Sequence, residues 1–187
     1  MSELVYIFGT VGSGKTAELL MKAHNYEASG KSVVVIAPSL DDRHGVGVVR
    51  TRINLSRKAD LVVDDLLDLS RIPEKTDLVL VDEVQFFSKG AIEQLREIAT
   101  RGTPVHCYGL RTDFRTQLFP AITRLMAVAD EIRETPTVCR MCSQKAIYNL
   151  KMVNGAATTE GQQVDIGGDE KYIPVCAGHY RSMVSLR

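Results

Sequence analysis

Near its start the chain carries glycine, lysine and threonine at a spacing that could bind phosphate. The pattern GxxxxGK(S/T) is matched by the eight residues Gly9-Thr10-Val11-Gly12-Ser13-Gly14-Lys15-Thr16. Glycines at these places let the backbone turn tightly and bring successive N–H groups around a β-phosphate. Lys15 would reach the β and γ oxygens of a nucleotide, and Thr16 would offer its hydroxyl to Mg²⁺. The alternative is a glycine-rich turn before an ordinary helix.

An acidic pair ends a later apolar run. The four apolar residues 78–81 lead directly into Asp82 and Glu83. A carboxylate at such a strand tip, on a strand neighbouring the phosphate loop, binds the Mg²⁺ shell of a nucleotide, and we assign that role to Asp82. Glu83, one residue further into the crevice, is placed to receive a proton. The alternative is a strand that merely ends in solvated acids.

Three more side chains are expected at the same edge of a sheet. Arg43 follows the apolar run 33–37, and Phe114 and Phe119 follow the run 105–110. Ligands of open α/β sheets bind beyond the carboxyl ends of the strands, so Arg43 is a candidate for phosphate contact, with a solvated loop charge as an equal alternative. The two aromatic rings could stack on a flat ring, although phenylalanine more often fills the core beneath a loop.

Four metal-binding side chains lie near the end of the chain in two close pairs. The first pair is Cys139 and Cys142, a CxxC, and the second is Cys176 and His179, a CxxH. Two short knuckles joined by a long loop are what tetrahedral Zn²⁺ needs, and four protein ligands make such a site closed and structural. A redox CxxC is the rival interpretation, but it leaves the second pair unexplained. The polar, glycine-bearing segment between the pairs, residues 151–168, predicts a loop that folds over a ligand, with zinc as its clasp.

These side chains need a scaffold of alternating strands and helices. Apolar runs predict strands at 4–8, 33–37, 78–81 and 105–110, and apolar periodicity predicts helices at 15–29 and 91–100. Residues 59–71 predict a strand end and a short helix. Alternation of this kind favours an α/β fold in which a parallel sheet carries helices on both faces. We expect a nucleotide-binding domain at residues 1–135 and a zinc-binding subdomain at residues 136–187.

Composition narrows the classes of partner. The chain has 187 residues, of which 44% are hydrophobic, enough for a sizeable core. Its 23 basic residues balance 23 acidic residues, so the net charge gives no reason to expect binding to nucleic acid or to a membrane. A strand that begins after Met1-Ser2-Glu3 leaves no room for a signal peptide, and no apolar run is long enough to span a membrane. We therefore expect a cytoplasmic protein.

Five motifs in order resemble those of the cytosolic, zinc-containing thymidine kinases. They are GTVGSGKT at 9–16, DEVQFF at 82–87, GLRTDFRTQLF at 109–119, CRMC at 139–142 and VDIGGDEKYIPVCAGHY at 164–180. A phosphate loop alone is weak evidence, whereas these five cover nearly the whole chain. Val11 and Arg111 stand where methionine and aspartate are more usual, which leaves open the choice between thymidine and deoxyuridine.

The resemblance implies a RecA-like core, a homotetramer, feedback inhibition by dTTP, and transfer of the γ-phosphoryl of ATP to the 5′-hydroxyl of thymidine or deoxyuridine. Glu83 would be the general base. ATP and Mg²⁺ would be held by the phosphate loop with Arg43, Asp82 and Gln85. The nucleoside would be held by Phe86, Leu110, Phe114, Phe119 and Tyr172. A segment that closes over the base and reads it through main-chain groups would comprise Gln163, Val164, Asp165, Ile166 and Gly167.

Two other classes of function compete with this one. A nucleic-acid-stimulated ATPase with a zinc module would carry a basic stripe, often interleaved with aromatic residues, and this chain is neutral. A nucleotide-binding regulatory module without catalysis would leave Glu83 unexplained. ATP consumption in the presence of nucleosides or single-stranded DNA separates these classes.

Overall fold

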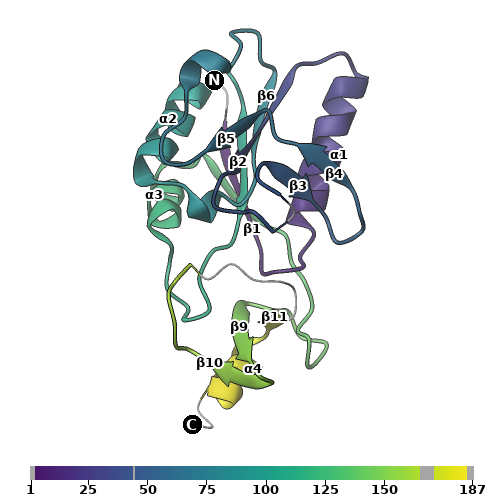
Figure 1. Cartoon of the computed structure of the whole chain (residues 1–187), viewed down its shortest axis with the longest axis vertical. Coiled ribbons are helices and arrows are strands. Elements are labelled where there is room, and N and C mark those ends of the chain that lie inside the picture. The colour runs from purple at the N-terminus through teal and green to yellow at the C-terminus, as the bar shows by residue number, and fades with distance from the viewer. Residues whose placement is uncertain (1–2, 44, 165–170, 185–187) are drawn as a thin grey trace.

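Six parallel strands form the central sheet of the computed structural model, which describes residues 3–43, 45–164 and 171–184. The strands lie in the order β5-β2-β6-β7-β1-β8, and each pairs in parallel with its neighbours. Figure 1 shows the sheet between helix α1 and helices α2 and α3. Their bounds are β1 Leu4–Phe8, β2 Val33–Pro38, β5 Leu61–Val63, β6 Leu78–Val81, β7 Val105–Gly109 and β8 Glu131–Glu134. The predicted parallel sheet is confirmed, and the four predicted strands are β1, β2, β6 and β7.

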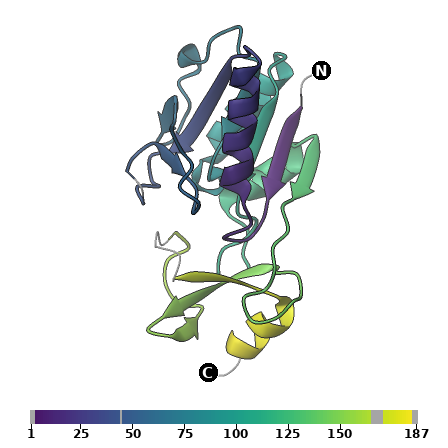
Figure 2. The same ribbon diagram turned by 90° about the vertical axis from the view of Figure 1, so that its right-hand side faces the viewer.

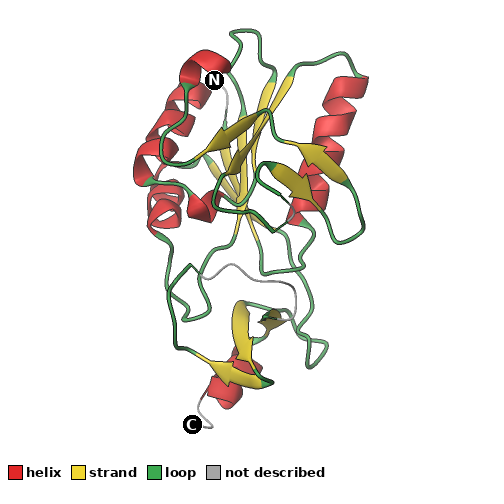
Figure 3. Ribbon diagram, in the orientation of Figure 1, coloured by secondary structure: helices red, strands yellow, loops and turns green. Residues whose placement is uncertain are grey.

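Helices cover both faces of this sheet (Figure 3). Helix α1, Lys15–Ala28, packs on one face, and helices α2, Lys89–Thr100, and α3, Pro120–Val128, pack on the other. Helix α2 begins where the Ser88 hydroxyl accepts the Ala91 N–H, a side-chain N-cap. Its buried residues recur with helical spacing at Ile92, Leu95 and Ile98. Two short 3₁₀ helices are η1, Leu69–Arg71, and η2, Val84–Phe86.

The strand that carries Asp82 is not adjacent to the strand that carries the phosphate loop. Strand β7 lies between β6 and β1, so the prediction that the two strands neighbour each other is wrong. Sequence runs identify strands but not their lateral order, because the order depends on how the crossover helices pack. One extra strand still leaves both strand ends at the same edge of the sheet.

A short antiparallel hairpin lies between β2 and β5 in the chain and forms a sheet of its own. Its strands are β3, Val48–Arg50, and β4, Ser56–Lys58. Val49 is buried in the core under α1 and fixes the hairpin against that helix. Within the turn, the Thr51 hydroxyl accepts the Leu55 N–H, and Asn54 has a positive φ of 64°. The sequence analysis did not predict this hairpin.

The end of the chain forms a second, smaller sheet below the first (Figure 2). Strands β9, Tyr148–Val153, β10, Ala156–Thr158, and β11, Tyr172–Val175, are antiparallel, and helix α4, Ala177–Val184, follows. The prediction of a loop over 151–168 is wrong at its start, because 151–153 and 156–158 are strands. Asn154 and Gly155, both with positive φ, make the two-residue hairpin turn that an Asn-Gly pair favours. Within the described residues, no helix combines the length and apolarity that a membrane crossing requires.

Candidate active site

The phosphate loop runs from the end of β1 into α1. Gly12 and Gly14 have φ values of 72° and 87°, a left-handed conformation that glycine adopts without strain. A Cβ at Gly9 would lie 2.5 Å from the Thr135 carbonyl oxygen, so only glycine fits where the loop leaves the sheet. The buried Lys15 ammonium donates hydrogen bonds to the carbonyl oxygens of Gly9, at 3.1 Å, and Thr10, at 2.9 Å. The loop therefore curls around the lysine that was expected to meet phosphate.

Burial and charge act in opposite directions on that lysine. Burial lowers the pKa of Lys15, and the carboxylates of Glu83 and Asp82 work against this change. The guanidinium groups of Arg52 and Arg43 lower the pKa further, which places two more cations within electrostatic reach of the ammonium.

Asp82 and Thr16 face each other across the loop. The Thr16 hydroxyl lies 3.4 and 3.5 Å from the two carboxylate oxygens of Asp82. Asp82 is only 6% exposed. Burial, followed by the negative charge of Glu83, raises the pKa of Asp82 to about 7, and Lys15 opposes that shift. A hydroxyl and a carboxylate together are hard oxygen ligands of the kind that Mg²⁺ takes alongside phosphate oxygens and water.

Glu83 is held in a left-handed backbone conformation with φ 47°. Such strain in a residue other than glycine gathers at functional sites. Arg43 Nη2 donates to Glu83 Oε1 at 2.6 Å, and Gln85 Nε2 donates to Glu83 Oε2 at 2.6 Å. Gln85 Oε1 in turn accepts the Leu110 N–H at 2.9 Å. Both carboxylate oxygens are thus aimed by neighbours, and Gln85 joins Glu83 to the loop after β7.

Arg43 lies between two acids. Besides Glu83, it binds Asp41 through Nε at 2.7 Å and Nη2 at 2.6 Å. The hydrogen bonds and charge of Asp41, with the charge of Glu83, raise the pKa of Arg43 although burial acts against them. The structure thus brings Arg43 to Glu83, although 33% of the arginine side chain stays exposed.

One cavity of about 1040 Å³ collects most of the predicted site residues. From the phosphate loop and the acidic edge it is lined by Val11, Gly12, Ser13, Gly14, Lys15, Thr16, Arg43, Glu83 and Gln85. From the predicted nucleoside set it is lined by Phe86, Leu110, Phe114, Phe119, Gln163 and Tyr172. Among the remaining predicted residues, Gly9, Thr10 and Asp82 do not line this cavity, and Val164 packs against the main core. The predicted contacts Asp165, Ile166 and Gly167 lie outside the described residues.

Two pairs of aromatic rings wall one end of the cavity. Phe86 meets Phe119 edge-on, with centroids 6.3 Å apart, and Phe114 meets Tyr172 at 6.1 Å. Phe114 and Phe119 are 2% and 3% exposed. Each ring is buried, as is common for phenylalanine, and each also lines the cavity.

Several residues of the cavity were not found by sequence reasoning. Five come from the turn of the unpredicted hairpin: Arg50, Thr51, Arg52, Ile53 and Asn54. Two more are polar and almost fully buried, Asp113 at 2% and Asn149 at 3% exposure. Asp113 follows the predicted strand β7 and could have been singled out there, whereas Asn149 lies in a strand that was not predicted.

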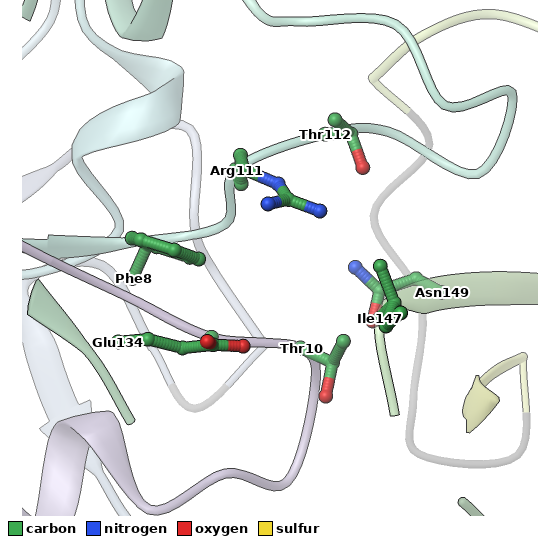
Figure 4. A pocket seen from close by; sticks show the side chains of 8 residues that line it. Phe8, Thr10, Arg111, Thr112, Glu134, Ile147 and Asn149 are labelled. Atoms are coloured by element: carbon green, nitrogen blue, oxygen red, sulfur yellow. The ribbon is translucent and has the colours of Figure 1, made fainter. Parts of the chain in front are cut away.

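Asn149 connects the second sheet to the phosphate loop. Its Oδ1 accepts the Val11 N–H at 2.9 Å. Beside this contact lies a second, small hollow of about 10 Å³, where Asn149 and Ile147 face Arg111 and Thr112 (Figure 4). The Arg111 guanidinium lies 5.3 Å from the centre of the Phe8 ring, which forms the back of this hollow.

The four predicted zinc ligands come together at the second sheet. Their ligand atoms all lie within 4.8 Å of one another. His179 Nδ1 is 3.2 Å from Cys176 Sγ and 3.7 Å from Cys139 Sγ, and Cys142 Sγ is 3.9 Å from Cys176 Sγ. Ligands at ordinary zinc bond lengths on a tetrahedron lie about 3.5–3.8 Å apart, so the cluster fits Zn²⁺. None of the four cysteines forms a disulfide.

Comparisons with known proteins identify the family of this chain. A family model described as thymidine kinase matches residues 2–180. The thymidine kinase of Streptococcus gordonii is 42% identical over 184 residues, which is 96% of each chain. That of Streptococcus agalactiae serotype Ia is 45% identical over 184 residues, 96% of this chain and 97% of its own. Among solved structures, the Pif1 helicase from Candida albicans aligns at a TM-score of only 0.41 and 16% identity, over 72% of this chain and 36% of its own. The chain belongs to the thymidine kinase family, whose members are ATP-dependent phosphotransferases.

Proposed function

We propose that this protein transfers the γ-phosphoryl group of ATP to the 5′-hydroxyl of thymidine or deoxyuridine. One observation carries the proposal: the phosphate loop, Glu83 and the aromatic rings all open into the same cavity. A nucleotide and a nucleoside bound there would meet at Glu83, between the loop and the rings. The proposal also draws on the names of the relatives, which are thymidine kinases.

The reaction needs positioning, charge neutralisation and one proton acceptor. The 5′-oxygen attacks the γ-phosphorus, a new O–P bond forms, and the bond from that phosphorus to the β,γ-bridging oxygen breaks, which releases ADP. We assign the hydroxyl proton to Glu83, whose carboxylate Arg43 and Gln85 already orient. Lys15 would neutralise the β and γ oxygens in exchange for the loop carbonyls that it now binds.

Two metal ions belong to the proposal. Thr16 and Asp82 would hold Mg²⁺, directly or through its waters, and the ion would neutralise charge on the phosphates of ATP. Cys139, Cys142, Cys176 and His179 would hold one structural Zn²⁺ and so join helix α4 to the loop before β9. We propose the division predicted from the sequence, with nucleotide bound by residues 1–135 and zinc by residues 136–187.

The nucleoside would lie between the aromatic pairs. Phe86, Phe114, Phe119 and Tyr172 offer ring faces and edges for a pyrimidine. The segment from Gln163 to Gly167 would close over the base and bind it through main-chain groups, as the resemblance implies. A homotetramer and feedback inhibition by dTTP remain predictions of the same resemblance. Light scattering tests the first, and turnover measured at increasing dTTP tests the second.

ADP release measured in parallel with thymidine, other nucleosides and single-stranded DNA tests the activity. We expect release that depends on thymidine or deoxyuridine, with phosphorylated nucleoside formed in equal amount. Release stimulated only by DNA would instead indicate the competing ATPase.

The substitution Glu83→Gln tests the proton acceptor. We expect turnover to fall by about 10²–10⁴-fold, the usual contribution of a general base, with nucleotide binding retained. Glu97→Gln, a matched change at an exposed glutamate on α2, should leave turnover unchanged. Normal turnover in Glu83→Gln would remove Glu83 from the mechanism.

A further inference from the structure

The turn of the β3–β4 hairpin places an arginine over the phosphate loop. A Cβ built on Gly12 would lie 2.9 Å from Arg52 Nη1 and 3.4 Å from Arg52 Cζ. The guanidinium therefore rests on the face of Gly12 from which a side chain would project. Arg52 lines the large cavity together with Lys15 and Thr16. A Cβ at this position would displace the guanidinium, so a side chain there is a direct test of the contact.

The hairpin fixes this position from outside the loop. Val49 is buried against helix α1, which itself begins at the end of the phosphate loop. Arg50 Nη2 binds Asn54 Oδ1 at 2.9 Å and so closes the turn on which Arg52 sits. The side chain thus projects from a braced turn.

Two cations that line the cavity, Arg43 and Lys15, contact the acidic edge and the phosphate loop. Arg43 binds both Asp41 and Glu83, and the latter is the assigned proton acceptor. Lys15 lies inside the loop. Phosphoryl transfer spreads negative charge over the equatorial oxygens of the moving group, and an arginine that contacts them accelerates the reaction strongly. Arg52 reaches the cavity from the hairpin, which also supplies Arg50, and its guanidinium lies over Gly12 of the phosphate loop.

We propose that Arg52 is a catalytic arginine that contacts the terminal phosphate of bound ATP and stabilises the transferring phosphoryl group. The inference rests on the proposed function, because it assigns a further residue to the same reaction. A guanidinium suits this role because it stays charged and offers several N–H donors in a plane.

Three variants test the assignment: Arg52→Ala, Arg52→Lys and, as a control, Lys58→Ala. Lys58 is an exposed cation on β4 of the same hairpin and does not line the cavity, so its removal changes the net charge equally. The affinities of each variant for ATP and ADP are measured without nucleoside, and turnover is measured with thymidine. We expect Arg52→Ala to lower turnover at least about 100-fold. This loss is smaller than the one such arginines usually give, because Arg52 is an exposed residue of the cavity. Arg52→Lys should recover only part of the loss.

A contact with the terminal phosphate has two signatures that damage to the hairpin lacks. Arg52→Ala should weaken ATP binding while ADP binding stays within twofold, and added guanidinium ion should restore part of its turnover. Equal losses of ATP and ADP affinity, a turnover loss below tenfold, or an equal loss in Lys58→Ala would each overturn the assignment. If the wild-type chain does not phosphorylate a nucleoside, the proposed function fails, whereas the comparison of ATP with ADP still tests the contact.

Discussion

The buried carboxylate of Asp113 ties the segment that enters the proposed lid to the loop after β7. Its Oδ1 accepts the N–H groups of Arg115, at 2.9 Å, and Gln117, at 2.8 Å, which closes the tight turn behind Phe114. Its Oδ2 accepts Gln163 Nε2 at 3.1 Å. Gln163 is the first residue of the segment that should cover the nucleoside, so one carboxylate sets both the ring and the start of the lid.

Replacing Asp113 by asparagine should break the hydrogen bond to Gln163 and keep the two backbone hydrogen bonds that close the turn. The new amide oxygen can still accept the two backbone N–H groups, but its NH₂ group then faces the NH₂ group of Gln163 and also Arg115 Nε, which lies 3.4 Å from Oδ2. A hydrogen bond to a charged acceptor contributes about 1.5–3 kcal/mol, and about 1–2 kcal/mol is reasonable here because Gln163 is half-buried. At 1.36 kcal/mol per factor of ten, the KM for the nucleoside should rise about 5–30-fold.

Steady-state kinetics with each substrate varied in turn measure this effect. The KM for ATP and the zinc content should stay unchanged, since neither site contacts Gln163 in the described part of the chain. Gln163→Met removes the donor from the other side and should raise the nucleoside KM by a similar factor. The neighbouring Gln162→Met, at an exposed position, is the matched control.

A double variant then decides whether the link itself is responsible. Because Asp113→Asn and Gln163→Met remove the same hydrogen bond, their effects should not add. A nucleoside KM within twofold of wild type, or full additivity in the double variant, refutes the reasoning.

Three further predictions concern the metal, the pH dependence and the support of the proton acceptor. Metal analysis should find about one zinc ion per chain. The variant Cys142→Ser should lose this zinc, and hydrogen exchange should show that the second sheet loses several kcal/mol of stability with it. Active protein free of zinc would contradict the site. Burial and the neighbouring Lys22 ammonium lower the pKa of His106 to about 4; an unfolded histidine has a pKa near 6.5, so between these values the unfolded chain binds more protons and stability falls as the pH falls. Between pH 7 and 5 the free energy of unfolding should fall by about 1–2 kcal/mol because of His106, allowing for its partial exposure. Urea unfolding of His106→Gln should show a smaller fall over the same pH range, and an equal fall excludes His106 as the cause. A Cβ at Gly109 would lie 2.5 Å from Gln85 Oε1, so Gly109→Ala should displace that side chain and lower turnover about tenfold with zinc retained. Unchanged turnover would show that the orientation of the Glu83 carboxylate by Gln85 does not matter for the proposed reaction.

The parts of the site that were predicted are those that short stretches of sequence encode. The phosphate loop needs its glycines, Lys15 and Thr16 in consecutive order, and the acidic pair directly follows a buried strand. The two cysteine-containing knuckles carry their own spacing, which is why the cluster at His179 was found without knowledge of the second sheet. Local patterns of this kind can be recognised without knowing the lateral order of the strands.

The parts that were not predicted depend on contacts between distant segments. The strands of the β3–β4 hairpin have three residues each and expose alternate side chains, so their apolar signal is too short to separate from a loop. The cavity-lining position of Arg52 follows from that hairpin and was missed with it. Asn149 was missed because its partner is a backbone N–H in the phosphate loop, 138 positions away in sequence. The position of β7 between β6 and β1 likewise has no local signature.

The hydrogen bond from Val11 to Asn149 has a thermodynamic consequence. It joins the phosphate loop to strand β9, which packs against the cysteines of the proposed zinc site. If docking of the second sheet preorganises the loop for ATP, then ATP must favour that docking by the same factor, since coupling between two bound ligands is reciprocal. Zinc loss would then weaken ATP binding from a distance, and saturating ATP would raise the affinity for zinc, measured by competition with a chelator, by the same factor. The retention of zinc at the second sheet would in this way depend on whether ATP occupies the phosphate loop.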